Sequence, residues 1–298
     1  MGNLILGNTL PYHDYVSLAA SNNTWFDYNM VVSFFTHPQN YYQGFTEEIH
    51  GVQMFIAHRF EFRMFSDKLR LTLNEAIMYH APDNTVDFRA FSPLLILHGL
   101  YIPANANSLA SAEVEYAPIR NLQLYASFVV DDFSVGDEPK APENDATLNM
   151  WGIMGGLRST IPFETGYFSI NVETVYTSPF MYHKDSYQEG AKYDYVLDYV
   201  GSVRLSNGKF NRQYLSFPFG SDAFAVLGGF SYTVPYKWNA GLKLFFMAHG
   251  ITNKNSIAEK YDGTENYVPD WLATKNPWTG EEGEISYTYN VGIDGEYY

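Results

Sequence analysis

Residues 52–65 read VQMFIAHRFEFRMF, and this stretch decides the class of fold. The side chains at even positions are apolar except for His58, whereas the odd positions include Arg59, Glu61 and Arg63. Successive side chains of a β-strand point to opposite faces of the sheet. The alternation therefore predicts a strand with one apolar face and one polar face.

The same alternation returns along the chain, at 69–74, 122–131, 168–176 and 285–294. The predicted strands run to roughly 10–14 residues, longer than the usual 5 or 6 and long enough for the 9–11 that a bilayer requires. A sandwich or a soluble barrel also produces alternation, but explains less well this length together with 17% aromatic residues. We therefore predict an all-β chain that forms an antiparallel transmembrane β-barrel.

Composition excludes several classes of protein. The 298 residues include 18 Lys and Arg against 33 Asp and Glu, a net charge of −15, which argues against nucleic acid as a partner. The absence of cysteine excludes disulfide scaffolds, thiolate metal sites and cysteine nucleophiles. No apolar run is long enough for a membrane-spanning helix. The first residues do not read as a signal peptide, so we expect a leader to have been removed or the chain to be a fragment.

The connections between predicted strands alternate between short and long. Short turns are expected at 66–67, 119–121, 163–165, 207–208 and 236–237, and longer polar stretches at about 38–51, 81–105, 134–147, 180–191, 217–222 and 251–282. The turn Asn207-Gly208 is the strongest of these signals, because Asn-Gly suits a type I′ hairpin. Strict alternation places every short turn on one side of a barrel and every long loop on the other, as in outer-membrane barrels.

These connections also predict the number of strands and the domain organisation. Strands from about residue 12 onward, with one more at Asn3–Asn8, give about fourteen, an even number as bacterial barrels require. We expect one barrel domain over residues 1–298. The helix-like stretch Phe91–Tyr101 lies inside a long loop and is expected to tuck into the barrel mouth.

The sequence does not point to an enzyme. It has no Gly-x-Ser-x-Gly elbow, and its eight histidines are scattered without a His-x-x-x-His pair. Asp131 and Asp132 are adjacent, so in a strand their carboxylates face opposite sides, although a glycosidase pair can still be assembled from different strands. The oxygen-rich segment 131–145 suits a hard cation but lacks the EF-hand pattern, so we interpret it as a solvated loop. We expect no enzymatic activity, no cofactor and no bound metal.

Charged residues on the polar phase of the strands predict a lumenal polar network. Its members are Arg59, Glu61, Arg63, Arg70, Glu113, Glu115, Asp131 and Glu173. Mixed charges in one lumen have two interpretations. They form an ion-pair ladder that stiffens and plugs the wall, or they present a polar surface that hydrogen-bonds sugars or controls permeation.

The long loops carry aromatic residues beyond those needed at a membrane interface. Within the last long loop, the candidate glycan-contacting residues are Tyr261, Asp262, Tyr267, Asp270, Trp271 and Trp278. Aromatic faces there can stack on sugar rings while the carboxylates accept hydrogen bonds from hydroxyl groups.

Several phrases, in order along the chain, resemble the capsule-assembly Wzi family of outer-membrane barrels. They are Gly2–Asn8 (GNLILGN), the hairpin from His58–Arg63 (HRFEFR) to Leu73–Glu75 (LNE), Tyr125 through Val130–Phe133 (VDDF), Val172–Thr177 (VETVYT) and Leu215–Asp222 (LSFPFGSD). The family barrel is larger, with eighteen strands, and its N-terminal part has no counterpart here. The resemblance thus implies that this chain is the C-terminal two-thirds of such a protein, truncated at its N-terminus.

The resemblance implies a function that the residues alone do not give. A Wzi-like protein assembles or retains capsular polysaccharide at the surface of a Gram-negative outer membrane, holding the polymer non-covalently at its external loops and mouth. By this analogy the partners are a surface polysaccharide and outer-membrane lipid, and the protein is a monomer. The alternative is a substrate-specific porin or uptake channel, which requires a water-filled lumen.

Overall fold

The computed structural model describes residues 3–7, 13–35, 51–81, 85–93, 106–132, 150–179, 181–182, 200–204, 210–250 and 285–298. Thirteen strands occur in this part of the chain. They are β1 (Asp14–Ser21), β2 (Phe26–Phe35), β3 (Val52–Met64), β4 (Leu69–Ala81), β5 (Ala106–Ile119), β6 (Leu122–Asp132), β7 (Met150–Pro162), β8 (Tyr167–Thr177), β9 (Val200–Arg204), β10 (Phe210–Tyr214), β11 (Ala223–Val234), β12 (Trp238–His249) and β13 (Ser286–Tyr297). One 3-10 helix, η1 (Phe88–Phe91), lies between β4 and β5. No helix in these ranges is long and apolar enough to cross a membrane.

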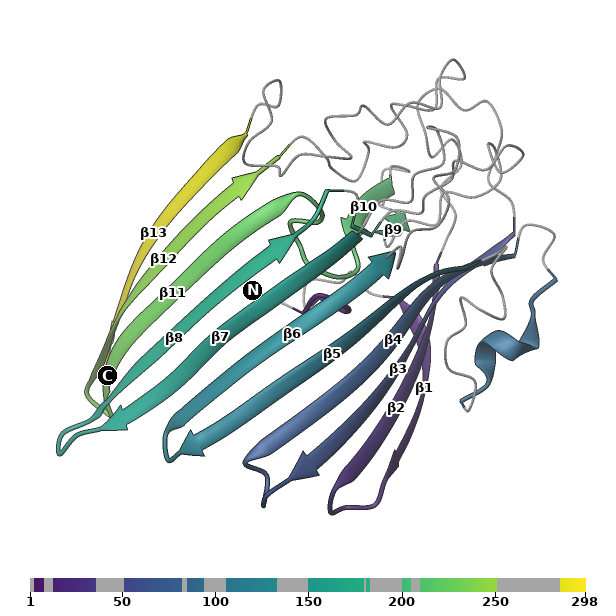
Figure 1. Ribbon diagram of the computed structural model, residues 1–298. Coiled ribbons are helices and arrows are strands. Elements are labelled where there is room, and N and C mark those ends of the chain that lie inside the picture. The colour runs from purple at the N-terminus through teal and green to yellow at the C-terminus, as the bar shows by residue number, and fades with distance from the viewer. Residues whose placement is uncertain are drawn as a thin grey trace, which may run out of the picture.

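Eleven of the strands form one antiparallel sheet in the order β1-β2-β3-β4-β5-β6-β7-β8-β11-β12-β13. The sheet curls strongly, and the short turns gather at one end of it, called here the turn end (Figure 1). The opposite end, from which the longer connections leave, is called the loop end. The all-β antiparallel barrel-type prediction is confirmed by this architecture, although the sheet is not closed and the expected strand count is not confirmed.

The predicted turns at 66–67, 119–121, 163–165 and 236–237 are confirmed. Phe65, Ser66 and Asp67 turn the chain between β3 and β4 with φ of 53°, 55° and 64°. The turn Asn207-Gly208 lies outside the described residues. Its flanking strands β9 and β10 pair only with each other, and β8 pairs directly with β11. The interpretation of these two segments as barrel-wall strands is therefore wrong.

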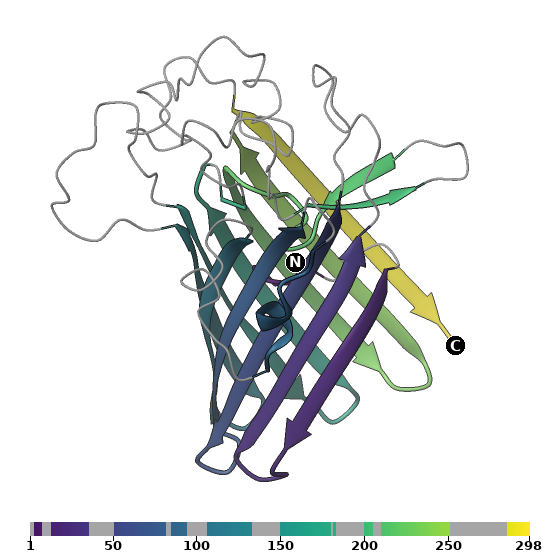
Figure 2. The same cartoon turned by 90° about the vertical axis from the view of Figure 1, so that its right-hand side faces the viewer.

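The two edges of the sheet run in the same direction. With eleven antiparallel strands, β1 and β13 both point toward the turn end, and Figure 2 shows them on either side of a gap. Direct pairing between these two edges would be parallel, whereas every other pair in the sheet is antiparallel.

The expected strand at Asn3–Asn8 is also not present over residues 3–7, which form a bent segment on the concave side of the sheet. Leu4 is completely buried there and Ile5 nearly so. Of the predicted helical stretch Phe91–Tyr101, residues 94–101 lie outside the described part.

Candidate functional site on the concave face

The register of β3, β4 and β5 places charged residues of all three strands on the concave face near the turn end. Arg63 lies opposite Arg70, and Arg70 lies opposite Glu115. Two residues along the same three strands, Glu61 lies opposite Thr72, and Thr72 lies opposite Glu113. Because each pair is adjacent in the sheet, their side chains extend into one layer above it.

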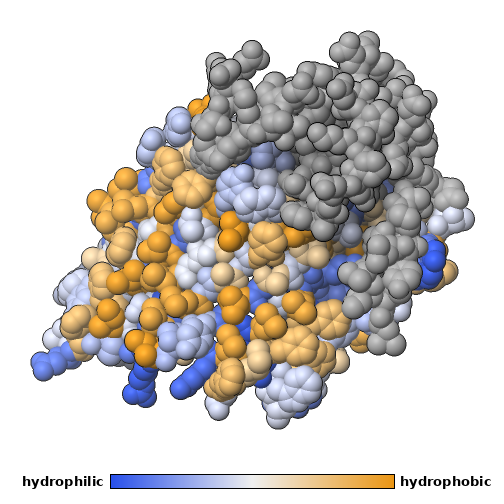
Figure 3. Space-filling model, viewed as in Figure 1, coloured by the Kyte–Doolittle hydropathy of each residue, from blue (hydrophilic) through white to orange (hydrophobic). Residues whose placement is uncertain are grey.

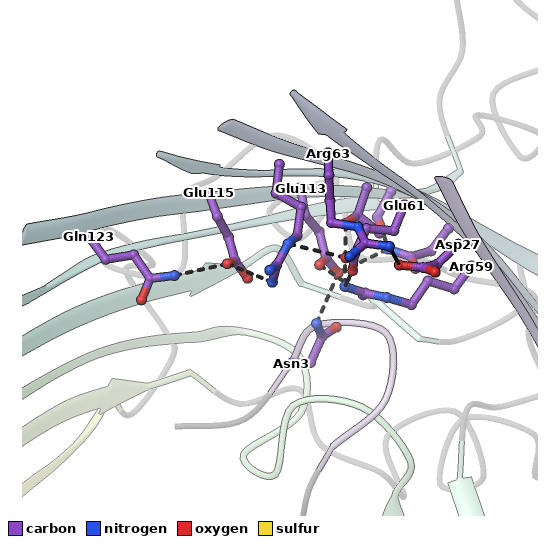
Figure 4. A network of polar contacts seen from close by, with 12 residues as sticks. Asn3, Asp27, Arg59, Glu61, Arg63, Glu113, Glu115 and Gln123 are labelled. Carbon is purple, nitrogen blue, oxygen red and sulfur yellow. Dashed lines mark hydrogen bonds and ion pairs between the residues drawn. The ribbon is translucent and has the colours of Figure 1, made fainter. Parts of the chain in front are cut away.

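Within this layer three arginines and four carboxylates form ion pairs (Figure 4). The nitrogen–oxygen distances are 3.2 Å for Arg59–Glu113, 3.1 Å for Arg59–Glu61, 3.1 Å for Arg70–Glu61, 3.2 Å for Arg70–Glu115 and 2.7 Å for Arg63–Asp27. Neutral side chains extend the network, with Gln123 and Asn74 donating hydrogen bonds of 2.9 Å to Glu115 and Glu113. We call this set of side chains the arginine network.

Six of the eight predicted lumenal residues therefore lie together: Arg59, Glu61, Arg63, Arg70, Glu113 and Glu115. Asp131 and Glu173 lie on the same face but nearer the loop end and have other roles. The Asp131 carboxylate accepts a 2.6 Å hydrogen bond from the backbone N–H of Tyr182, and buried Glu173 accepts one of 2.7 Å from the Tyr125 hydroxyl. Asp131 therefore holds the segment around Tyr182 against the wall, and Glu173 fixes the side chain of Tyr125 within it.

The loop-end half of the concave face is apolar and covered by three short segments. These segments pack on wall residues such as Phe55 and Met78. They comprise residues 3–7, residues 178, 179, 181 and 182, and residues 214–222. We call these three segments the inner cover. The predicted connection at 217–222 is present between β10 and β11, but it folds inward and does not project outward, since Phe217 is completely buried on this face.

Hydrogen bonds hold the inner cover together. The backbone N–H of Gly7 donates to Leu215 (2.6 Å), and the Ser216 hydroxyl donates to the Ile5 carbonyl (2.8 Å). Tyr182 donates its hydroxyl to the Leu4 carbonyl (3.1 Å), and complete burial raises the pKa of this phenol well above its ordinary value. The phenol therefore remains a neutral donor.

Gly220 allows the last part of the inner cover to turn back on itself. Its φ is +76°, and an added Cβ would overlap the ring of Tyr214. Both features require glycine at this position. The sequence phrase Pro218-Phe219-Gly220 was a detectable turn signal, but nothing in the alternation pattern indicated that the segment folds inward.

The convex face is the apolar wall of the molecule. Outward positions of β6, β7, β12 and β13 expose residues such as Leu124, Ile153, Leu244 and Ile293. Figure 3 shows the resulting apolar surface, with hydrophilic residues at the turn tips.

Aromatic residues lie at both ends of this wall. Near the turn end, the rings of Tyr232 and Trp238 pack in a tilted arrangement with their centroids 5.5 Å apart, and near the loop end those of Trp151 and Tyr176 do so at 5.0 Å. Trp151 and Phe163 mark the two ends of β7. The twelve residue steps from Trp151 to Phe163 correspond to roughly 28 Å of height at a 45° tilt, close to the apolar band of outer-membrane barrels.

All six candidate glycan-contacting residues, from Tyr261 to Trp278, lie outside the described residues, so their arrangement stays a prediction. In the part of the chain that the structure does cover, no group of three or more His, Asp or Glu side chains is placed to hold a metal ion.

Comparisons with known proteins give one informative result. No family model matches the sequence, and no curated protein matches it. A search of solved structures finds similarity to Wzi, which is described as an outer-membrane protein involved in group 1 capsule assembly in Escherichia coli and as a carbohydrate-binding β-barrel. The match covers 99% of this chain and 62% of that chain, with a TM-score of 0.50 and 13% sequence identity. At this identity the similarity establishes the fold: the chain has the antiparallel architecture of a Wzi-like β-barrel.

Proposed function

We propose that the chain is part of an outer-membrane β-barrel that binds capsular polysaccharide non-covalently and retains it at the surface. The binding site would lie on the external loops at the loop end, with the candidate residues between 261 and 278 stacking on sugar rings. The curved wall would anchor these loops in the membrane, with its short turns in the periplasm. The carbohydrate binding described for the structurally similar Wzi supports this substrate class.

The observation that carries this proposal is the lining of the concave face. The arginine network lines its turn-end half on β2–β6, and the inner cover packs on its loop-end half. An ion-paired layer and an apolar layer, one after the other along the barrel axis, would obstruct a path through the interior. This arrangement suits an anchor and not a channel. The alternative porin requires a hydrated path through the same space. In this proposal the ion pairs support the wall and do not contact the polymer.

The first test is the conductance of the full chain in a planar bilayer, with and without polysaccharide. A stably inserted, silent protein is the expected result. A large, steady conductance blocked by a small solute would instead establish the porin.

The second test measures binding of purified capsular polysaccharide to the inserted chain. The double variant Trp271→Ala/Trp278→Ala should lose most of the binding, because stacking aromatic faces contribute much of the affinity at such sites. Trp25→Ala, at the turn end, is the matched control and should bind normally. Unchanged binding by the double variant would refute the proposed role of these tryptophans.

A further inference from the structure

The outer wall has a polar cluster where a lipid-facing surface should be apolar. His58 and Glu75 occupy outward positions of β3 and β4, directly opposite each other in the register. Both lie about midway along their strands, and their exposures are 0% and 7%. Ionisable residues at membrane depth are costly and need protein around them.

Residues 85–93, which include η1, cover this cluster from outside the sheet. We call them the outer strap. Its Ala90 belongs to the same buried apolar cluster as Met30, Ile56 and Ile77, which all point outward from the wall. Figures 1 and 2 both show η1 on the convex side of β2–β4.

The outer strap is fixed at both ends by hydrogen bonds to wall tyrosines. The backbone N–H of Asp87 donates to the Tyr79 hydroxyl at 2.9 Å. At the other end, the Tyr28 hydroxyl donates to the Pro93 carbonyl at 3.1 Å and lies 2.9 Å from Nδ1 of His58. A hydroxyl has a single proton, so His58 is the donor in the second contact and carries its proton on Nδ1.

The strap also satisfies many of its own polar groups. The N–H groups of Ala90 and Ser92 donate to the carbonyls of Asp87 and Arg89, and the Asp87 side chain accepts from the N–H of Arg89. The guanidinium of Arg89 forms a multidentate ion pair with the same carboxylate, so the strap is neutral. Non-helical backbone near hydrocarbon persists only when its polar groups are paired in this way.

One large apolar side chain projects outward from this neutral strap. Phe88 is 82% exposed, on the same side of the sheet as the exposed apolar residues of the wall. We propose that the outer strap is a lipid-contacting part of the wall, which presents Phe88 to the acyl chains of the external leaflet and shields the His58–Glu75 pair from them. Arg89, 62% exposed, extends its guanidinium toward the headgroups, with Asp87 as its counter-ion.

This inference rests on the proposed insertion in a membrane. The test must therefore distinguish a failure of the strap to contact lipid from a failure of the whole chain to insert. Because the chain has no cysteine, a single cysteine labels one site. Phe88→Cys is labelled with a nitroxide in the full chain, refolded into phosphatidylcholine vesicles. Ile153→Cys, on the opposite wall, is the control for hydrocarbon, and Glu164→Cys, in the β7–β8 turn, is the control for water.

The readout is the collision rate of each label with oxygen, which concentrates in hydrocarbon, and with a water-soluble nickel chelate. The Phe88 label should favour oxygen over chelate as the Ile153 label does. Chelate access like that of the Glu164 label would overturn the inference and place the strap in water. Slow collisions of the Phe88 label with both oxygen and the chelate would also overturn the inference, because they would mean that another protein covers the strap. If the Ile153 label itself met chelate, membrane insertion, and not the strap alone, would be refuted.

Discussion

The side-chain amide of Asn3 donates a 2.9 Å hydrogen bond to the carboxylate of Glu113, a residue 110 positions later in the chain. Glu113 also accepts from Arg59 and from Asn74. This one carboxylate therefore joins the inner cover to the arginine network. Both halves should contribute to the stability of the wall.

Arg59→Ala should destabilise the wall, because it leaves Glu61 and Glu113 facing each other without their shared cation. Removing one partner of a buried pair costs 3–5 kcal/mol, and the partial exposure of Arg59 reduces the expected loss to about 1–3 kcal/mol. The temperature at which the folded band is lost on a heat-modifiability gel should fall. Lys243→Ala is the control, since the Lys243–Asp294 pair spans 3.7 Å with side chains 72% and 52% exposed. A shift no larger than that of the control would show that the arginine network contributes nothing.

Leu4→Ala tests whether the first residues belong to the inner cover. Leu4 is 0% exposed, so truncation should cost about 2–5 kcal/mol through lost burial and a cavity. Leu6→Ala, two residues along and 37% exposed, should cost much less. Urea unfolding of the two variants in detergent, followed by near-UV circular dichroism, measures the difference. Equal losses would contradict the inward placement of this segment.

Which residues share a face of the wall was predictable from the sequence. The alternation in residues 52–65 predicted β3 to within one residue and correctly grouped Arg59, Glu61 and Arg63. The same rule on β4 and β5 added Arg70, Glu113 and Glu115. A period of two residues records side-chain direction directly, so a local pattern was sufficient.

Which segments cover each face was not predictable in this way. Leu4-Ile5-Leu6 has the composition of a short strand, and only its long-range contacts with Leu215 and Ser216 reveal its position. His58 interrupted the apolar face in the sequence, but its cover, the outer strap, begins 27 residues later. Such packing depends on contacts between distant segments, for which periodicity carries no signal.

The strong negative charge predicts an unusual salt dependence of polysaccharide binding. The net charge of −15 repels an acidic polymer, and this repulsion is screened as the Debye length falls from about 30 Å at 0.01 M salt to about 8 Å at 0.15 M. Binding of an acidic capsular polysaccharide should therefore strengthen with added salt, whereas binding of a neutral polymer should stay constant. Co-sedimentation with protein-loaded vesicles measures both. Weaker acidic-polymer binding at higher salt would point to a local cationic site in place of stacking and hydrogen bonding.

Tyr28→Phe tests how the outer strap is held. The substitution keeps the ring, which packs 5.0 Å from that of Phe60, but removes the hydroxyl that joins His58 to Pro93. A buried donor or acceptor that loses its partner costs about 1–3 kcal/mol, so the Pro93 end of the strap should detach more often. In a Phe88→Cys background, the nitroxide spectrum should then show a more mobile label. Tyr289→Phe, at an exposed outward position of β13, is the control and should leave the spectrum unchanged. An immobile label in the Tyr28 variant would mean that apolar packing around Ala90, and not the hydroxyl bridge, holds the strap to the wall.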